Sequence, residues 1–145
     1  MPRFHFRLAP VLRFREQVKR QKQSELAQLN RRQFELQSEI ESLERDCDSE
    51  VFTSDEGTET VWSAEEIRVH ADYVASLLLR LKYKRAALAE LENRVAQKRQ
   101  EVVEAVRAVK ALEQLRARAA EKFWHDLQIT EQKATDEIGL RKFIE

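Results

Sequence analysis

The chain has 145 residues with 26 basic and 26 acidic side chains, so its formal net charge is zero, and it contains two glycines and two prolines. A β or α/β fold of this length needs many turns built from Gly, Pro, Asn and Asp, so the composition excludes those classes and predicts long helices in one domain. A net charge of zero gives no overall attraction to nucleic acid or to an anionic membrane. No apolar run approaches the ~18 residues of a membrane span, and the Arg-rich start does not resemble a secretory signal, so we expect a cytoplasmic protein.

The first predicted helix covers about residues 8–48, and Pro10 fits its first turn because a proline there has no hydrogen bond to lose. Apolar side chains recur along it at alternating steps of four and three residues, the repeat of a coiled-coil seam. Six of the seven seam positions are apolar, and the row reads Leu26, Leu29, Gln33, Leu36, Ile40, Leu43 and Cys47. Nearer the N-terminus the same frame meets charged residues, so we expect the register to drift toward Val11, Phe14 and Val18.

Residues 49–62 interrupt this pattern with Ser, Thr, Asp, Glu and Gly57, and they predict a loop. Ser63 follows, with Glu66 three residues later and an apolar repeat beyond. This spacing predicts a capping box, in which each residue's side chain bonds the other's backbone N–H at a helix start.

The second predicted helix covers about residues 63–140. Its seam frame runs without a slip from 67 to 112, and eleven of the fourteen positions are apolar. The row reads Ile67, His70, Val74, Leu77, Leu81, Lys84, Leu88, Leu91, Val95, Lys98, Val102, Ala105, Val109 and Leu112. A helix of this length has no core of its own, so it predicts a coiled-coil arm.

Two long helices joined by one loop predict an antiparallel coiled-coil hairpin with a longer second helix. Folding about residue 56 pairs position i with about 112 − i, which places Ile40 near Asp72 and Leu12 near Gln100. The last ~35 residues, from about 105, then project without a partner. An unpartnered helix is a candidate docking surface when it carries large apolar side chains. This stretch carries Phe123, Trp124, Leu127, Ile129, Ile138, Leu140, Phe143 and Ile144. The alternative is that it packs on the first few residues of the chain or on a second copy.

Charge is segregated along the chain. Residues 1–32 hold nine Lys or Arg and two acidic residues, whereas residues 35–66 hold twelve acidic residues and one Arg. One interpretation is that the two ends of the hairpin meet different partner surfaces. The alternative is that both blocks are solvated flanks of a coiled coil.

The residue types of catalysis and metal binding are scattered. His5, His70 and His125 lie too far apart in a hairpin to converge on one metal, and no His is placed to activate Cys47 as a nucleophile. We expect His70 to be a tolerated polar seam residue and Cys47 to be a small buried thiol. Neither glycine belongs to a phosphate-binding loop. The sequence therefore argues against an enzyme, and no cofactor or metal is expected.

Two stretches at the ends of the chain carry recognisable motifs. Residues 6–29 read FRLAPVLRFREQVKRQKQSELAQL, an aromatic-basic-Leu start followed by Val-Leu, two arginines and a Ser-Glu-Leu-Ala run. Residues 131–143 read EQKATDEIGLRKF, in which a Glu, a Lys and an Asp-Glu pair precede an apolar residue. With the chain length and the expected hairpin, these stretches resemble the FliJ family of the flagellar type III export apparatus over nearly the whole chain.

The resemblance implies an antiparallel coiled-coil stalk that sits in the pore of the hexameric export ATPase, FliI, promotes its assembly and links it to the export gate protein FlhA. It also implies handling of empty substrate chaperones, and a place at the cytoplasmic side of the membrane. The family's gate-contacting patch corresponds here to Tyr73 and Leu77, whereas Arg80 and Lys84 depart from its pattern.

For the ATPase we expect contact through the end that bears the termini, by a basic block and by the overhang. The block comprises Arg13, Arg15, Lys19, Arg20 and Lys22, and the overhang contributes Phe123, Trp124 and Leu127. Three alternatives stay open: an injectisome stalk of the same design, a homodimeric coiled-coil scaffold, and a nucleic-acid binder that uses the basic block.

Overall fold

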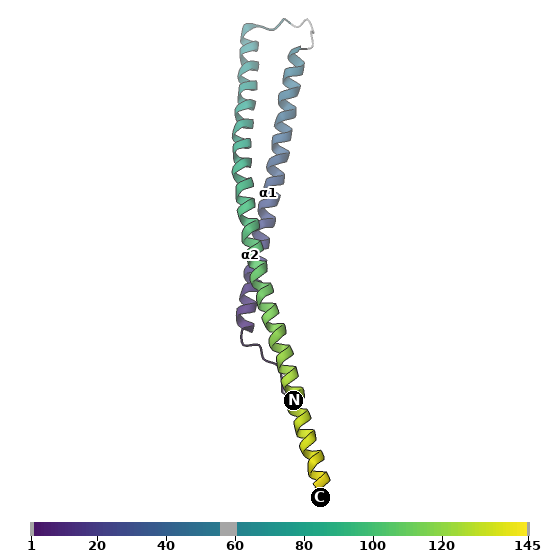
Figure 1. Cartoon of the computed structure of the whole chain (residues 1–145). Coiled ribbons are helices and arrows are strands. Elements are labelled where there is room, and N and C mark those ends of the chain that lie inside the picture. Colours follow the sequence, from purple (N-terminus) through teal and green to yellow (C-terminus); the bar gives the residue numbers. More distant parts are fainter. Residues whose placement is uncertain (1, 56–60, 145) are drawn as a thin grey trace. The chain divides into compact units, whose positions relative to one another are not determined.

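The computed structural model describes the backbone of residues 2–55 and 61–144, and the side-chain surroundings of residues 2–50 and 61–144. Two helices account for nearly all of it: α1, Ala9–Asp55, and α2, Ala64–Ile144 (Figure 1). The described residues contain no strand, so the predicted all-α class is confirmed. Part of the predicted loop, with Gly57, lies outside the described residues.

The start of α2 is the predicted capping box. The backbone N–H of Ser63 donates to Glu66 Oε2 at 3.0 Å, and the N–H of Glu66 donates to Ser63 Oγ at 3.2 Å. Two N–H groups that a helix start leaves without a partner are thus satisfied. Arg141 and Lys142 in the last turn of α2 complement the negative end of the helix dipole.

Both helices extend beyond their predicted ends. The helix α1 continues to Asp55 rather than stopping near 48, because residues 49–55 contain neither Gly nor Pro and polar residues alone do not end a helix. The helix α2 continues through Gly139 to Ile144, so this glycine lies inside the helix.

Contacts divide the chain into two compact units, which are described separately. The terminal unit comprises Met1–Lys22 and Glu101–Glu145, and the loop unit comprises Gln23–Gln100. Each unit therefore contains one segment of α1 and one of α2.

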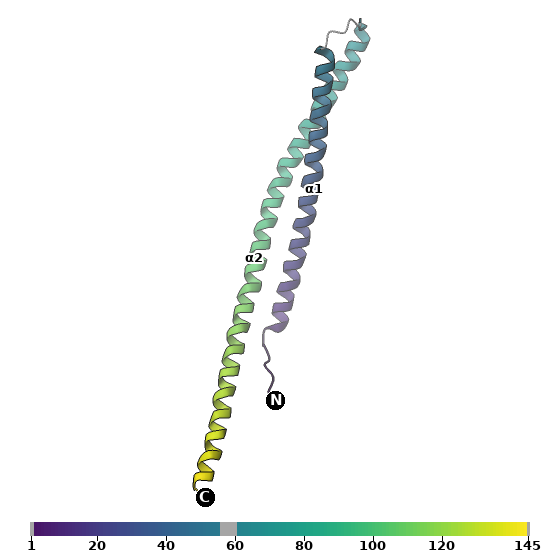
Figure 2. The same cartoon turned by 90° about the vertical axis from the view of Figure 1, so that its right-hand side faces the viewer.

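In the loop unit the two helical segments run in opposite directions (Figures 1 and 2). Lys84 Nζ lies 2.6 Å from Glu39 Oε2, and Lys98 Nζ lies 2.8 Å from Glu25 Oε2. The core is a row of leucines and one isoleucine contributed by both helices. It consists of Leu36, Ile40, Leu81 and Leu91, with Leu29, Leu43 and Leu88 packed against them.

The predicted seam matches this burial closely. Every frame position from Leu26 to Cys47 and from His70 to Leu112 is buried or half-buried, including Lys84 and Lys98. The alkyl stems of such lysines can cover apolar surface while the ammonium reaches a carboxylate on the facing helix. Ile67 is exposed, so the seam of α2 begins one step later than predicted.

In the terminal unit the pairing of α1 and α2 continues, with Leu12 and Val109 buried and Lys22 bonded to Glu101 at 3.1 Å. Val11 and Phe14 are exposed, so the expected drift of the seam onto their stripe is wrong for those two residues. Leu12 keeps its frame position: it is buried and packs the first turns of α1 against α2.

The predicted pairing register is also wrong. In the three lysine–glutamate pairs, Lys22–Glu101, Lys98–Glu25 and Lys84–Glu39, the two residue numbers add up to 123 rather than to about 112. Ile40 accordingly clusters with Leu81 rather than lying near Asp72. The later end of α1 moves the turn toward the C-terminus, and every pairing shifts with it.

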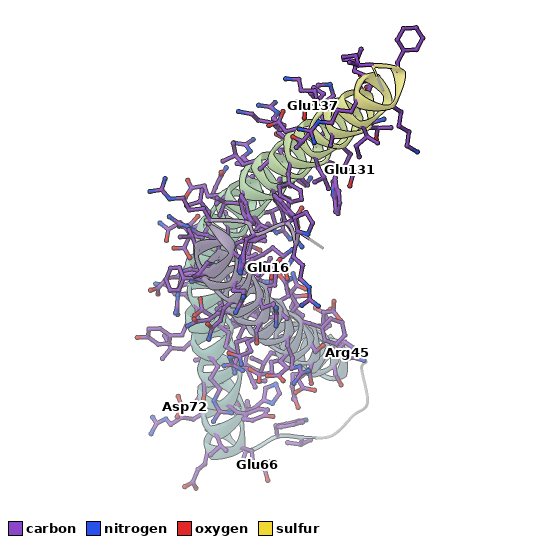
Figure 3. All side chains as sticks on the ribbon, turned by 90° about the horizontal axis from the view of Figure 1, so that it is seen from below. Glu16, Arg45, Glu66, Asp72, Glu131 and Glu137 are labelled. Atoms are coloured by element: carbon purple, nitrogen blue, oxygen red, sulfur yellow. The ribbon has the colours of Figure 1, made fainter. Side chains whose placement is uncertain are left out.

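The unpartnered part of α2 is shorter than predicted. On α2 the residues 113–119 are exposed, Ala120, Phe123 and Leu127 are half-buried, and every described side chain from 128 to 144 is exposed. Figure 3 shows Glu131 and Glu137 on this stretch, where the terminal unit has no second helix. Phe123 and Leu127 therefore do not belong to a bare overhang, and the Phe4–Phe123 contact fits the alternative that this stretch packs on the first few residues.

A pair of leucine variants on α2 tests the seam. Leu81→Ala removes a buried seam side chain and should lower the free energy of unfolding by about 2–4 kcal/mol. Leu79→Ala removes a half-exposed leucine outside the seam and should cost less than about 0.5 kcal/mol. Urea unfolding followed by circular dichroism measures both, and equal losses would contradict the assigned seam.

Candidate partner-binding surfaces

The basic side chains expected to meet an ATPase line the first turns of α1 in the terminal unit. They are Arg13, Arg15, Lys19, Arg20 and Lys22. Lys22 is engaged with Glu101 across the helix pair, and Arg20 lies 4.0 Å from Glu16 on its own helix. Arg13 and Arg15 are exposed and make no ion pair within the described part of the chain. Lys22 thus forms an ion pair between the two helices, while Arg13 and Arg15 are accessible to a partner protein.

An aromatic cluster lies in the same unit. The Phe4 and Phe123 ring centroids are 5.7 Å apart, and the edge-on Phe123–Trp124 pair is separated by 5.2 Å. Such tilted pairs favour contact between the positive edge of one ring and the negative face of the other. Trp124 remains 54% exposed, whereas Phe123 and Leu127 are half-buried. Of the predicted overhang contacts, Trp124 is therefore the most accessible.

A hollow of about 290 Å³ lies beside this cluster and brings the aromatic and basic residues to one place. Its lining includes Phe4, Phe6, Leu12, Arg13 and Arg116. Arg13 therefore lies close to the segment that covers Phe123, so these two predicted contact residues lie in one region of the terminal unit.

Sequence reasoning missed Phe4 and Phe6. Both precede α1, in a non-helical segment of residues 2–8 that we call the strap, and both are half-buried. The available signal was the presence of two aromatics ahead of the first helix, since aromatics in an otherwise polar terminus predict packing against a neighbouring element.

The two residues expected to meet the export gate differ in accessibility. Tyr73 is 48% exposed, but Leu77 is 2% exposed because it occupies a seam position. Lys84 also lies in the seam and is bonded to Glu39. A side chain packed between two helices cannot touch a partner while they stay together, so Tyr73 alone of this pair presents itself at the surface.

Other apolar side chains on the outer faces of the loop unit were not singled out from the sequence. They are Phe34, Val69, Leu78, Leu79 and Tyr83, all more than half exposed. Their signal was their position outside the seam frame, where a coiled coil normally carries polar residues. Phe34 lies on α1, and the other four extend the accessible apolar surface of α2 beyond Tyr73.

The start of α2 forms a second hollow, of about 610 Å³. Trp62, Glu65, Val69 and Tyr73 contribute to its lining, together with His70, whose ring lies 5.6 Å from the Trp62 ring. His70 Nδ1 lies 3.4 Å from Glu50 Oε2 on α1. His70 is half-buried in the seam, as expected for a tolerated polar seam residue.

Glu39 is the carboxylate most affected by its surroundings. The hydrogen bond from Lys84 lowers the pKa of Glu39 from its ordinary value of 4.5, and the charges of Lys84 and Arg32 act in the same direction. Burial acts in the opposite direction and raises the pKa. The interaction that fixes the register of the loop unit therefore depends on pH.

The described residues show no feature that binds a metal or spans a membrane. Cys47 is a free thiol buried in the seam, as expected. No group of three or more His, Cys, Asp or Glu is placed to hold a metal ion within residues 2–50 and 61–144. Across the same residues, neither helix has a stretch apolar and long enough to cross a bilayer.

Comparison with protein families shows which family the chain matches. The family model described as Flagellar FliJ protein matches residues 4–145, which is nearly the whole chain. The match includes residues 4–8 of the strap, both helices and the unpartnered part of α2. No curated protein and no solved structure matches the chain significantly.

The Glu39–Lys84 pair predicts a sign for the pH dependence of stability. Because the folded-state pKa of Glu39 is lowered, its contribution is fully present above 4.5 and is lost as the pH falls through the lowered value. Glu39→Gln should therefore be less stable than wild type at pH 7, and the difference should shrink on acidification. Urea unfolding between pH 7 and pH 3 measures it.

Glu41→Gln is the matched control, because Glu41 has no ion pair within the described part of the chain. A stability difference for Glu39→Gln that grows as the pH falls would contradict the assignment.

Proposed function

The chain belongs to the FliJ family of flagellar export proteins, and on that premise we propose that it serves the export ATPase as a central stalk. In this proposal it binds the FliI hexamer, promotes ring assembly and hydrolysis, and links the ring to the export gate protein FlhA. It also escorts empty substrate chaperones. It works at the cytoplasmic side of the membrane, at the base of the flagellum, and contributes no catalytic residue.

The observation that carries the proposal is the construction of the terminal unit. Beyond Leu127 every described side chain of α2 is exposed, and this stretch follows directly on Phe123 and Trp124. A single helix whose every described side chain is exposed buries too little to be stable alone, so it gains most from a partner. A ring pore surrounds a helix on all sides and would cover such a surface.

The basic side chains also support the terminal unit as the part that contacts the ATPase. Arg13 and Arg15 are exposed and lie in the unit that contains the aromatic cluster. Arginine at an interface rim raises the association rate and selects an acidic partner surface. Trp and Arg are also the residue types that most often carry binding energy in interfaces.

A stalk of two helices can influence a ring of identical subunits because it lacks their symmetry. Each subunit of the hexamer then meets a different face of the helix pair. A ligand shifts an equilibrium by its differential affinity for the two states, so unequal contacts bias which subunit adopts the hydrolysing conformation. The stalk needs no chemistry of its own for this effect.

For the gate we propose contact through the early turns of α2 in the loop unit. Tyr73 offers an accessible aromatic side chain there, and the exposed leucines Leu78 and Leu79 add apolar surface. Leu77, buried in the seam, would support the helix pair beneath the contact rather than touch the gate.

The double variant Phe123→Ala, Trp124→Ala tests the ATPase contact. It should lower stimulation of ATP hydrolysis and the population of FliI rings by about tenfold or more, since losing two aromatic anchors typically costs at least 1.4 kcal/mol. The assay compares hydrolysis and ring formation with and without the chain.

Phe34→Ala is the control, because it removes an exposed aromatic from the loop unit. Helicity of both variants is checked by circular dichroism. Stimulation by the double variant equal to wild type would refute the proposed contact.

Tyr73→Ala tests the gate contact separately. It should weaken binding to the cytoplasmic domain of FlhA about fivefold or more while leaving ATPase stimulation unchanged, because Tyr73 lies in the loop unit. Calorimetric titration measures the first quantity. A loss of ATPase stimulation with intact FlhA binding would reverse the assignment of the two units.

A further inference from the structure

A second row of half-buried side chains lies on α2 past the point where α1 begins, separated from the seam by the exposed residues 113–119. Lys22 faces Glu101, and the same register puts the first residue of α1, Ala9, level with about residue 114 of α2. Yet Ala120, Phe123 and Leu127 are still half-buried beyond that level. They follow the three- and four-residue steps of a coiled-coil seam without a helix to pair with.

The strap, residues 2–8, provides the cover in place of a helix. Its Phe4 ring packs against Phe123 at 5.7 Å, and Phe6 is half-buried as well. In the described part of the terminal unit, residues 2–8 are the portion that precedes α1 and can reach this level of α2. The strap therefore occupies the position that a helix would take if α1 were longer.

The strap holds this position weakly. Its backbone hydrogen bonds in the described chain run from Ala9 N–H to Phe6 O and from Leu12 N–H to Leu8 O, and both lead into α1 rather than across to α2. The hollow of about 290 Å³ beside Phe4 and Phe6 leaves part of their surface without packing contacts. Few backbone bonds and loose packing are the properties of segments that open locally at little cost.

A helix would cover the same row better than the strap does. The row on α2 has coiled-coil spacing and resumes at Ala120 after the exposed residues 113–119, so an amphipathic helix with apolar residues at matching steps can pack on it. Beyond Leu127 the same helix would meet side chains that are now bare, including Ile138. The occupant that fits is therefore an amphipathic helix and not an extended peptide.

We propose that the strap is a built-in competitor: it covers Ala120, Phe123 and Leu127 in the free chain and gives way to an amphipathic helix of the export ATPase. The identity of the occupant rests on the proposed function, whereas the covering role of the strap does not. The row is then accessible to the ATPase ring when the ring is present, and it is covered by the strap in the free chain.

Phe4→Ala tests the proposal because it loosens the strap without touching the covered row. Removing the Phe4–Phe123 pair should raise the open fraction, and so lower the chain concentration that gives half-maximal ATPase stimulation, by about twofold to tenfold. The matched control is Phe14→Ala, which removes an exposed aromatic from the same unit and should leave that concentration unchanged.

A second measurement uses the chain alone. In a Trp62→Phe background Trp124 is the single tryptophan, and its ring contacts Phe123. Phe4→Ala should increase the quenching of its fluorescence by acrylamide, and Phe14→Ala should not. Circular dichroism confirms that both variants keep their helices.

The outcomes separate the two proposals. If wild type stimulates the ATPase but Phe4→Ala needs the same or a higher concentration, the strap is a structural brace or a contact residue, and the competitor proposal is wrong. If the chain does not stimulate the ATPase at all, the proposed function fails, and with it the ATPase as occupant. Unchanged quenching of Trp124 in Phe4→Ala would overturn the covering role itself.

Discussion

The structure depends on one row of apolar side chains along which α1 and α2 meet. There is no second layer behind this row in the described residues, so each seam leucine is shielded by neighbours on two helices alone. Burying such a side chain contributes about 1.5–3 kcal/mol, and the sum over many turns offsets the entropy of ordering two long helices. Because the seam supplies the stability, the outer faces are free to carry aromatics and charges for other purposes.

Ion pairs beside the seam choose among the alignments that the seam allows. A heptad row matches its partner again after every seven residues, so burial alone discriminates poorly between registers. The Lys22–Glu101, Lys98–Glu25 and Lys84–Glu39 pairs all obey one register. Each is partly solvated and stabilises only modestly, but together they penalise the alternatives. A pairing shifted by one heptad would separate the two partners of all three lysine–glutamate pairs and give each residue a different neighbour.

The dependence on a single apolar seam also accounts for the difference between the two units. In the loop unit the seam is covered by helix on both sides, and the accessible features are isolated outer residues such as Tyr73 and Leu79. In the terminal unit the cover changes from helix to strap and then ends, although α2 continues to Ile144. In our proposals, the part of α2 that extends beyond its pairing with α1 is a surface that binds another helix. Membership of the FliJ family makes a flagellar export component the source of that helix in our proposals.

The sequence by itself determined the fold class, the capping box and nearly every seam position. Periodicity and capping depend on residues close together in the chain, and the tertiary contacts agree with them. His70 and Cys47 were likewise assigned correctly from their places in the frame. The tertiary structure decided the register, the end of α1 at Asp55 and the true start of the bare stretch of α2 after Leu127. These depend on which turns face each other, and a repeating seam is compatible with several answers. It also decided that Phe4 lies on Phe123, because contacts between residues more than a hundred positions apart leave no periodic trace in the sequence.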